Sequence, residues 1–416
     1  MTARGVSLLV ASVLAWVLGR LLGLQELYVV AATAAAFVAV AAVAVRLSTA
    51  TVSAHRSLGQ ARLRTGASTE VVMHLRNDSR LPASVLLVED ECHPALRGEG
   101  AGGDPRFVVS GLGPGRQASF RYAVHGRRRG RYAVGPLRLR LRDPFGLAER
   151  VRHYPGSVEV VVYPLVEPLG EGITRGNHRG SEASDTRRLF SSGEEFYTLR
   201  EYVIGDDLRQ VHWPSTAHRS KLMVRQQELQ WQPEAVLFCD TRRAAHHGTG
   251  VDSTLERAVS VTASLLWHLS DHRYEVRLAT EEDARHPVAA PRDALLDRLA
   301  ELEPTPIEGV GPALSCLRGA EAGGLFCAVV APPPGADAVA RHPDVRALLA
   351  CGRRFSGRLA VVVVPPDDPG ARGAGLAGLL TAAGWRAVVL GPGDALAARW
   401  PELVAPRRRR TTGAPR

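Results

Sequence analysis

Residues 1–46, MTARGVSLLVASVLAWVLGRLLGLQELYVVAATAAAFVAVAAVAVR, contain two long apolar runs that decide how the fold begins. The first run, residues 5–24, is interrupted only by two serines and one arginine, and the second, residues 27–45, is rich in alanine. Each run approaches the roughly 20 residues that an α-helix needs to cross the hydrocarbon layer of a membrane. Because only Gln25 and Glu26 separate the runs, we predict a tight hairpin of two transmembrane helices over residues 1–46.

Positive charge outside the turn indicates the orientation of this hairpin. Arginines flank both of its outer ends: Arg4, Arg46, Arg56, Arg62 and Arg64. The short turn carries Glu26, so the positive-inside rule predicts that both termini and the large soluble portion lie in the cytoplasm. Arg20 would cost about 3 kcal/mol at a helix centre, and less near a helix end from which its side chain reaches the interface.

A cleaved signal peptide is the alternative interpretation of the first apolar run. It fits poorly, because a second apolar run follows at once and no small-x-small cleavage site separates the two. The lipid bilayer is therefore the expected environment of the hairpin. Because alanine-rich transmembrane helices pack closely against partners, we also expect that the protein can self-associate through these helices.

From residue 47 to residue 165 the apolar periodicity is two, which is typical of β-strands. Residues 137–142 read LRLRLR, the alternation of a strand with one buried face. The other predicted strands cover residues 71–76, 85–89, 107–110, 119–125 and 158–163. Short strands separated by turn residues predict an antiparallel β-sandwich of the immunoglobulin-like type, although the Cys…Trp…Cys pattern of antibody domains is missing from the sequence. Its basic hairpin tip, Arg127-Arg128-Arg129-Gly130-Arg131, is either a solvated turn or a contact with lipid headgroups.

Residues 234–404 follow a different pattern, in which short apolar runs alternate with helical periodicity. The predicted strands are residues 235–239, 274–279, 325–331, 359–364 and 386–390, and the predicted helices are residues 253–272, 294–302, 336–350 and 371–383. This alternation predicts an α/β domain with a mostly parallel sheet and helices on both faces. We expect residues 166–233 to connect the two domains, with a mobile loop at 170–188, and residues 405–416 to form a basic tail.

Asp240 closes the first predicted strand of the α/β domain, at the end of the sheet where ligands bind. This order of elements looks like a von Willebrand factor A domain, which binds a divalent metal through an Asp-x-Ser-x-Ser run. Here Arg242 and Ala244 stand in place of both serines, and a guanidinium repels a cation, so we expect a degenerate site and no metal. Neither GxxxxGK[ST] nor GxGxxG after a strand is present, so we also expect no nucleotide or other cofactor.

Composition gives weaker information about partners. The net charge is +10, but five of these ten charges come from arginines within the last ten residues, so it is a poor argument for nucleic acid, and we expect none as a partner. The five cysteines are scattered without a CxxC pair, which indicates reduced, mostly buried thiols in a cytosolic setting.

Residues 193–228, GEEFYTLREYVIGDDLRQVHWPSTAHRSKLMVRQQE, mix both charge signs with large aromatics. The candidate interaction residues of this central block are Glu195, Phe196, Arg200, Glu201, Tyr202, Gly205, Asp206, Asp207, Arg209 and Trp213. Catalysis is disfavoured, because the interleaved arginines favour inert ion pairs and no nucleophile has an obvious base, so we expect no catalytic residue. Two interpretations stay open. The block is a clamp between domains, with Trp213 buried and arginine–carboxylate pairs, or it is a docking surface for another protein.

The whole layout resembles a bacterial membrane family known as domain of unknown function 58, with a degenerate von Willebrand factor A-like domain. The resemblance rests on residues 129–132 (RGRY), residues 143–147 (DPFGL) and the central block. Ile204, His212 and His218 depart from the family pattern, and the two histidines change its charge. The resemblance implies association with MoxR-type AAA+ ATPases in envelope or complex-assembly processes, and it implies no enzymatic activity.

These observations predict a membrane-anchored, non-enzymatic scaffold with a cytoplasmic protein-interaction region. A metal-dependent binding module of the von Willebrand A type is the main alternative. A hydrolase of envelope material is a further alternative, and it would require the soluble part to lie outside the cell.

Overall fold

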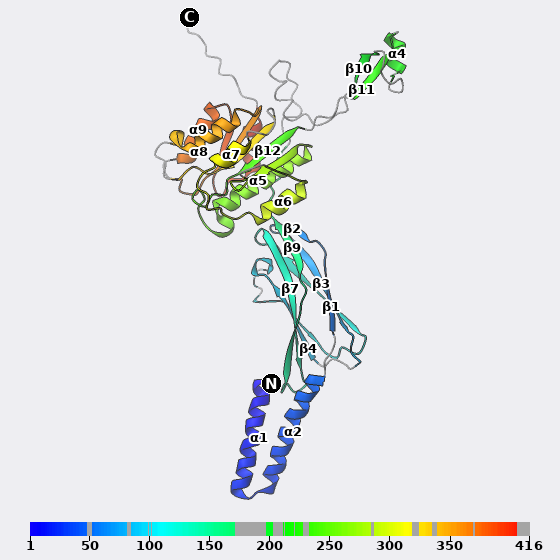
Figure 1. Ribbon diagram of the computed structural model, residues 1–416. Coiled ribbons are helices and arrows are strands. Elements are labelled where there is room, and N and C mark those ends of the chain that lie inside the picture. Colours follow the sequence, from blue (N-terminus) through cyan, green and yellow to red (C-terminus); the bar gives the residue numbers. More distant parts are fainter. Residues whose placement is uncertain are drawn as a thin grey trace. The chain divides into compact units, whose positions relative to one another are not determined.

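A computed structural model describes residues 1–47, 52–80, 85–98, 100, 102–170, 197–202, 211, 213–219, 221–227, 233–283, 287–317, 324–334, 339–368 and 371–405. The chain divides into two compact units, Met1–Tyr163 and Pro164–Arg416 (Figure 1). The expected loop from residue 171, most of the central block and the basic tail from residue 406 lie outside the described residues.

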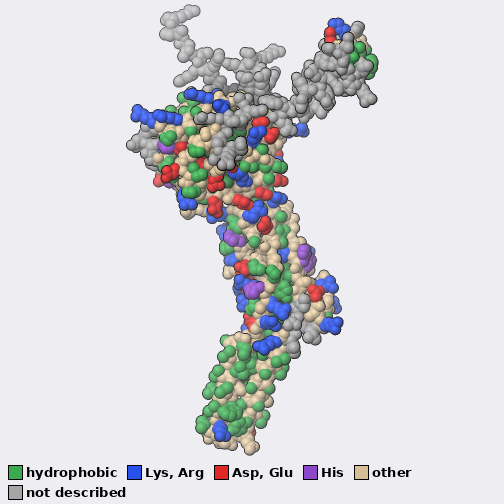
Figure 2. All heavy atoms as spheres, viewed as in Figure 1, with side chains coloured by type: hydrophobic (Ala, Val, Ile, Leu, Met, Phe, Trp, Pro, Cys, Tyr) green, Lys and Arg blue, Asp and Glu red, His purple; other side chains and the backbone are tan. Residues whose placement is uncertain are grey.

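The first unit begins with a helical hairpin, α1 (Ala3–Leu22) and α2 (Gln25–Leu47). Gly23 ends α1 in the left-handed conformation with φ 68°, which a glycine adopts without steric cost. The Ser12 hydroxyl of α1 donates a 2.7 Å hydrogen bond to the Ala31 carbonyl of α2, and this bond fixes the register of the two helices. Among the described residues, these two helices are long and apolar enough to span a membrane, and Figure 2 shows their largely hydrophobic surface.

Two sheets follow the hairpin. The first has the strand order β1-β3-β6, with β1 (Val52–Leu58), β3 (Ser68–Asn77) and β6 (Gln117–His125) antiparallel to their neighbours. The second has the order β2-β9-β7-β4-β5, with β2 (Arg62–Arg64), β9 (Val158–Tyr163), β7 (Gly130–Arg142), β4 (Val85–Cys92) and β5 (Arg106–Val109), and β8 (Glu149–Tyr154) pairs with β7. Met73 of the first sheet and Leu139 of the second belong to one buried cluster, so the sheets pack face to face. The immunoglobulin-like type stays a prediction.

The expected strands are present, but β1, β2 and β8 were missed and β7 is longer than predicted. The predicted strand at residues 137–142 is the second half of β7, which has 13 residues and so runs for roughly 40 Å. The basic tip at residues 127–131 lies at the start of β7, whereas the turn after Arg142 contacts the helical hairpin. Within this unit the tip therefore lies away from the predicted membrane helices, which argues against its role as a lipid contact.

The second unit contains a six-stranded sheet of order β14-β13-β12-β15-β16-β17. Its strands are β12 (Glu234–Cys239), β13 (Glu275–Ala279), β14 (Val288–Ala289), β15 (Leu325–Val330), β16 (Gly357–Val363) and β17 (Arg386–Leu390). All neighbours are parallel except β13 and β14. The helices are α5 (Thr254–Asp271), α6 (Arg292–Glu301), α7 (Gly311–Cys316), α8 (Pro343–Gly352), α9 (Arg372–Ala382) and α10 (Leu396–Val404). The mostly parallel sheet is as predicted; the specific von Willebrand A assignment stays a prediction.

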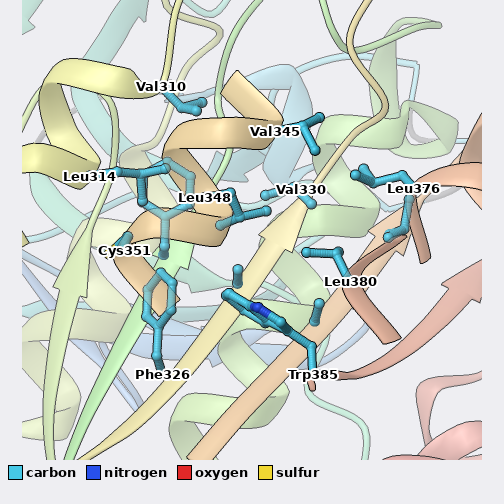
Figure 3. Packing of buried hydrophobic residues seen from close by; sticks show 14 of the residues in the cluster. Val310, Leu314, Phe326, Val330, Val345, Leu348, Cys351, Leu376, Leu380 and Trp385 are labelled. Carbon is cyan, nitrogen blue, oxygen red and sulfur yellow. The ribbon is translucent and has the colours of Figure 1, made fainter. Parts of the chain in front are cut away.

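Alternate residues of the buried strands form a core with α7, α8 and α9. Phe326 of β15 lies 5.5 Å, edge to face, from the indole of Trp385, and Leu348 and Leu380 pack around them (Figure 3). Gly352 ends α8 directly against the Trp385 ring, so that an added Cβ would overlap the indole. The sequence therefore needs glycine here because of close packing, not because of backbone conformation.

The helices α5 and α10 pack together and hold the segment that enters the second unit. His268 of α5 and Trp400 of α10 lie 4.8 Å apart as an edge-to-face ring pair. Glu167 pairs with Arg257 of α5 at 2.6 Å and accepts a hydrogen bond from the Ala397 amide of α10 at 3.1 Å. The segment Pro164–Gly170 is thus fixed to α5 and α10.

The described part of the central block forms a small hairpin with a helix. Strand β10 (Tyr197–Glu201) pairs antiparallel with β11 (Met223–Gln227), and α4 (Trp213–Arg219) lies between them in the sequence. Four cysteines of the described residues are buried and lie outside any disulfide: Cys92, Cys239, Cys327 and Cys351.

Candidate functional site

The carboxyl ends of β12, β13 and β15 meet at one edge of the sheet. Strand β12 lies between β13 and β15, so the chain leaves it first to one side and later crosses to the other. In parallel sheets such a switch point is where ligands bind. Asp240 follows β12, Glu281 follows β13 by two residues, and Ala331 follows β15, so residues far apart in the sequence converge here.

Asp240 is fully buried, and its carboxylate is occupied by Arg242. The Arg242 Nε and Nη2 atoms donate to the two carboxylate oxygens at 2.9 and 2.7 Å, which is a bidentate pair. The backbone amides of Arg242 and Ala331 donate to the same two oxygens at 3.1 and 3.2 Å. Burial alone would raise the pKa of Asp240, but the hydrogen bonds and charge of Arg242 outweigh burial and lower it.

The third nitrogen of the same guanidinium holds Asp344, at the start of α8. Arg242 Nη1 donates to Asp344 Oδ2 at 2.5 Å, and the Val310 amide donates to the other oxygen, Oδ1, at 3.1 Å. Asp344 lies in the first turn of α8, where the helix dipole favours a negative charge. One guanidinium therefore joins the end of β12 to the beginning of α8.

Glu281 contributes a third buried carboxyl group, and its side chain is 2% exposed. Its Oε2 accepts hydrogen bonds from the Thr241 amide at 2.9 Å and the Thr241 hydroxyl at 2.6 Å. Burial, followed by the charge of Asp240, raises the pKa of Glu281 to about 8. At neutral pH Glu281 is therefore mostly protonated, so the cluster holds two carboxylates and one guanidinium, not three anions.

His246 closes the cluster on the side of the loop before α5. Its Nε2 donates to the Asp240 carbonyl at 2.7 Å, and its Nδ1 lies 3.1 Å from the Thr254 hydroxyl. Burial lowers the pKa of His246 despite the opposing charge of Asp240. The imidazole is therefore neutral, with its proton on Nε2 and Nδ1 accepting from Thr254.

This donor set does not fit a divalent cation. Mg²⁺ needs free oxygen ligands, and both Asp240 oxygens already accept from a guanidinium and from the backbone. Within the described ranges no group of three or more His, Cys, Asp or Glu side chains is arranged to hold a metal ion. The positive charge at this end of the sheet belongs to Arg242 itself.

The sequence singled out Asp240 and the arginine near it, but not Glu281, Asp344 or His246. Glu281 was detectable, because it follows a predicted strand as Asp240 does, and the rule for carboxyl ends applies to both. Asp344 carries no such signal, because its partner Arg242 lies 102 residues away.

The described residues of the central block lie on the hairpin and on α4. Glu201 pairs with Lys221 at 2.7 Å on an exposed surface, and the Tyr202 amide donates to the Leu222 carbonyl at 2.8 Å. Trp213, which the clamp interpretation would bury, is 68% exposed. Arg200 lies in β10, opposite Val224, and the structure describes its backbone but not its side chain. The block's other candidates also lie outside the described residues: Glu195, Phe196, Gly205, Asp206, Asp207 and Arg209.

Comparison with solved structures gives only weak likenesses. A CARDB domain from Pyrococcus furiosus, in complex with di-metal ions, is 13% identical, covers 27% of this chain and 93% of its own, and has a TM-score of 0.20. Native α2-macroglobulin from Escherichia coli, from domain MG7 to the C-terminus, is 16% identical over 34% of this chain and 22% of its own, with a TM-score of 0.23. At such scores neither assigns a fold or a function to this chain.

Comparison with sequences is more informative. The uncharacterized protein YeaD of Bacillus subtilis (strain 168) is 24% identical over 217 residues, which cover 51% of this chain, and the chain spans about half (52%) of the length of that relative. The family model described as "Protein of unknown function DUF58" matches residues 198–364, which include β10, β11, α4 and the buried cluster around Arg242. Residues 198–364 therefore match the DUF58 family model.

Proposed function

We propose that this protein is a membrane-anchored, non-enzymatic adaptor whose soluble units present a binding surface to another protein in the cytoplasm. The partner in this proposal is a MoxR-type AAA+ ATPase, which the resemblance to the DUF58 family suggests. The observation that carries the proposal is the placement of Arg242 between Asp240 and Asp344 at the carboxyl end of the sheet. In the same proposal the first unit is immunoglobulin-like and the second is von Willebrand A-like.

Because Arg242 occupies the switch point of the sheet, we propose that the partner binds an outer surface of the protein. To admit a metal or an anionic substrate, the cluster would have to give up a buried ion pair, and breaking such a pair costs about 3–5 kcal/mol. The same groups also join β12 to α8, so a ligand would disrupt the fold that it needs. In this proposal the buried cluster at the carboxyl end of the sheet stabilises the fold, and exposed residues bind the partner protein.

The hairpin of the central block offers such a surface. Trp213 is 68% exposed and Leu222 is 40% exposed. The next residue, Met223, begins β11 and is buried. Exposed tryptophan is unusual on a soluble surface and is enriched at binding hot spots. The pair of Glu201 and Lys221 borders this surface with one charge of each sign, as in the polar rim of an interface.

The membrane anchor in this proposal is the hairpin of α1 and α2. Arg4 and Arg46 are exposed at the two helix ends opposite the turn, which supports a cytoplasmic position for both ends under the positive-inside rule. A reporter fused to the C-terminus tests this orientation, because a reporter accessible only from outside the cell contradicts the model.

Copurification of the full-length protein after mild detergent extraction tests the partner. We expect the ATPase to copurify with the wild-type protein and to be lost with Trp213→Ala. The matched control is Val251→Ala, which truncates another exposed apolar side chain, 60% exposed, outside the central block. An ATPase missing from the wild-type pulldown, or equal loss with both variants, overturns the proposed partner or the proposed surface respectively.

A further inference from the structure

The turn between β7 and β8 packs directly on the helical hairpin. The hydroxyl of Thr2, which caps α1, donates to the Gly146 carbonyl at 2.5 Å, and the Thr2 amide donates to the Leu147 carbonyl at 3.1 Å. Leu147 and Ala148 are buried in one cluster with residues of both helices: Leu8, Leu9, Val38, Ala41, Ala42 and Val45. The turn is therefore a fixed part of the hairpin surface.

Asp143 gives this turn a defined shape. Its buried carboxylate accepts from the Phe145 amide at 2.9 Å and from the Ala148 amide at 2.5 Å, and its carbonyl accepts from the Gly146 amide at 3.0 Å. Gly146 has φ +70°, a conformation that a side chain would strain. Such a turn presents the side chain at position 145 in one direction.

Phe145 points its ring along the apolar side of α2. It is 61% exposed, and its centroid lies 4.6 Å from that of Phe37, which is itself partly exposed. Phe37 lies ten residues before the end of α2 at Leu47, which is roughly 15 Å along the helix axis. Phe145 thus extends the apolar surface of the hairpin, which includes the exposed Val40 and Val43 on the same helix.

Two guanidinium groups approach the same turn. A Cβ built on Gly146 would lie 3.7 Å from Arg142 Nε and 3.9 Å from Arg4 Nη1, so both side chains border the space above this glycine. The Arg142 side chain is 53% exposed, and its Nε lies 3.8 Å from a carboxylate oxygen of Glu149. Arg46 and Arg150 are also exposed near these ends of the hairpin and of β8. Figure 2 shows Lys and Arg side chains on the sheets next to the hydrophobic hairpin.

We infer that the β7–β8 turn is a lipid-binding site, in which Phe145 inserts among acyl chains while Arg4 and Arg142 bind the phosphate of an anionic phospholipid. The inference rests on the proposed membrane anchor. An aromatic ring continuous with the apolar helices and two guanidinium groups above it match one molecule with an apolar tail and an anionic head. A free phosphate would match the arginines but would leave the exposed face of the Phe145 ring uncovered.

Fluorescence quenching tests the insertion of the ring. The full-length protein is reconstituted into nanodiscs of phosphatidylcholine and phosphatidylglycerol, with or without bromine on the acyl chains. We expect Phe145→Trp to add a fluorescence component that brominated chains quench. The matched control, Arg128→Trp, adds an indole at an exposed site near the other end of β7, where we expect no additional quenching. Equal quenching of both added indoles overturns the insertion.

Native mass spectrometry of protein released from the same nanodiscs tests the headgroup contact. We expect the wild-type protein to retain phosphatidylglycerol in preference to phosphatidylcholine. Arg4→Gln with Arg142→Gln should reduce that preference about 30-fold, at about 1 kcal/mol for each arginine near an anionic surface. The control pair, Arg127→Gln with Arg128→Gln, carries the same charge change at the other end of β7 and should keep the preference.

The outcomes separate this inference from the anchor on which it rests. Extraction of wild-type protein from membranes by alkaline carbonate would show that the anchor itself fails. A wild-type protein that resists extraction but shows no phosphatidylglycerol preference, or whose preference survives the Arg4 and Arg142 substitutions, overturns the lipid site alone. The wild-type lipid measurement needs no substitution, so misfolding of a variant cannot account for its result.

Discussion

Arg242 and Asp240, two residues apart in the chain, form a bidentate ion pair of 2.9 and 2.7 Å that is buried at the carboxyl end of β12. The short loop between them folds the arginine back over the end of its own strand. Since the same guanidinium also reaches Asp344, the pair closes the edge of the sheet at which related folds bind ligands.

Removing the guanidinium should destabilise the sheet strongly. Arg242→Met leaves Asp240 and Asp344 buried without a counterion, and we expect a loss of about 3–5 kcal/mol in the free energy of opening of β12. Hydrogen exchange of the β12 amides measures this quantity. Arg277→Met is the matched control, because its pair with Glu234 is partly exposed and should contribute no more than about 1 kcal/mol. Equal losses in the two variants would contradict a special role for Arg242.

Placing serines at positions 242 and 244 should create a metal site beside Asp240. Calorimetry with Mg²⁺ should give no saturable heat for the wild-type protein, because Arg242 occupies both oxygens of Asp240. Arg242→Ser with Ala244→Ser frees these oxygens beside two hydroxyl ligands and should give saturable binding. Arg243→Ser with Ala244→Ser keeps Arg242 and should stay silent. Saturable binding to the wild-type protein would show that the guanidinium does not exclude a cation.

Glu281 should make stability fall as the pH rises. Because burial and then the charge of Asp240 raise the pKa of Glu281 from 4.5 to about 8, the folded protein keeps a proton that the unfolded chain releases. This contribution is fully present below the unfolded pKa and is lost as the pH rises through the folded pKa, at up to about 1.4 kcal/mol per pH unit. Glu281→Gln keeps an acceptor for Thr241 and cannot ionise.

The thermal midpoint of Glu281→Gln minus that of the wild-type protein should therefore increase between about pH 5 and about pH 8. Asp240 and Arg242, whose charges interact with Glu281, are the same in both proteins, so the difference largely removes their own contribution. A difference that stays flat across this range would mean that Glu281 is ionised in the folded protein.

Two glycine-to-alanine substitutions should change the stability of the protein in opposite directions. Gly352→Ala places a Cβ in the Trp385 ring and should cost about 1–3 kcal/mol through overpacking. Gly378→Ala, on an exposed position of α9 with nothing within 4 Å of the added Cβ, should stabilise the helix by about 0.5–1 kcal/mol. Thermal unfolding of the full chain measures both, and a loss at both positions would contradict the packing described here.

The predicted fold was most reliable where burial imposes a simple pattern. β15 and most of β12 and β16 are apolar runs, and α5 has helical spacing of its apolar residues, so local sequence was sufficient. α10 was missed because Pro401 lies inside a helix of nine residues, although Trp400 and Leu403 are among its fully buried side chains. β8 was missed because it lies at an edge and carries Arg150, Arg152 and His153, so its apolar alternation is weak.

The candidate site was predictable in part. The replacement of two serines correctly directed attention to Arg242, but its second partner depends on a crossover that brings α8 to the end of β12. The pairing of Arg242 with Asp344 depends on the topology of the domain, and no local sequence pattern around Asp344 predicts it. The central block had the strongest local signal, yet that signal alone does not distinguish a clamp from a docking surface.

The bond from Thr2 to Leu147 also orders events during synthesis. The two residues are 145 positions apart, so at 5–20 residues per second the ribosome completes the turn about 7 to 30 s after it makes Thr2. In that interval the hairpin lacks its contact with Leu147, whereas the bond from Ser12 to Ala31 lies within the hairpin itself. Under the proposed membrane anchor, the two helices therefore pair in the bilayer before the β7–β8 turn can dock on them.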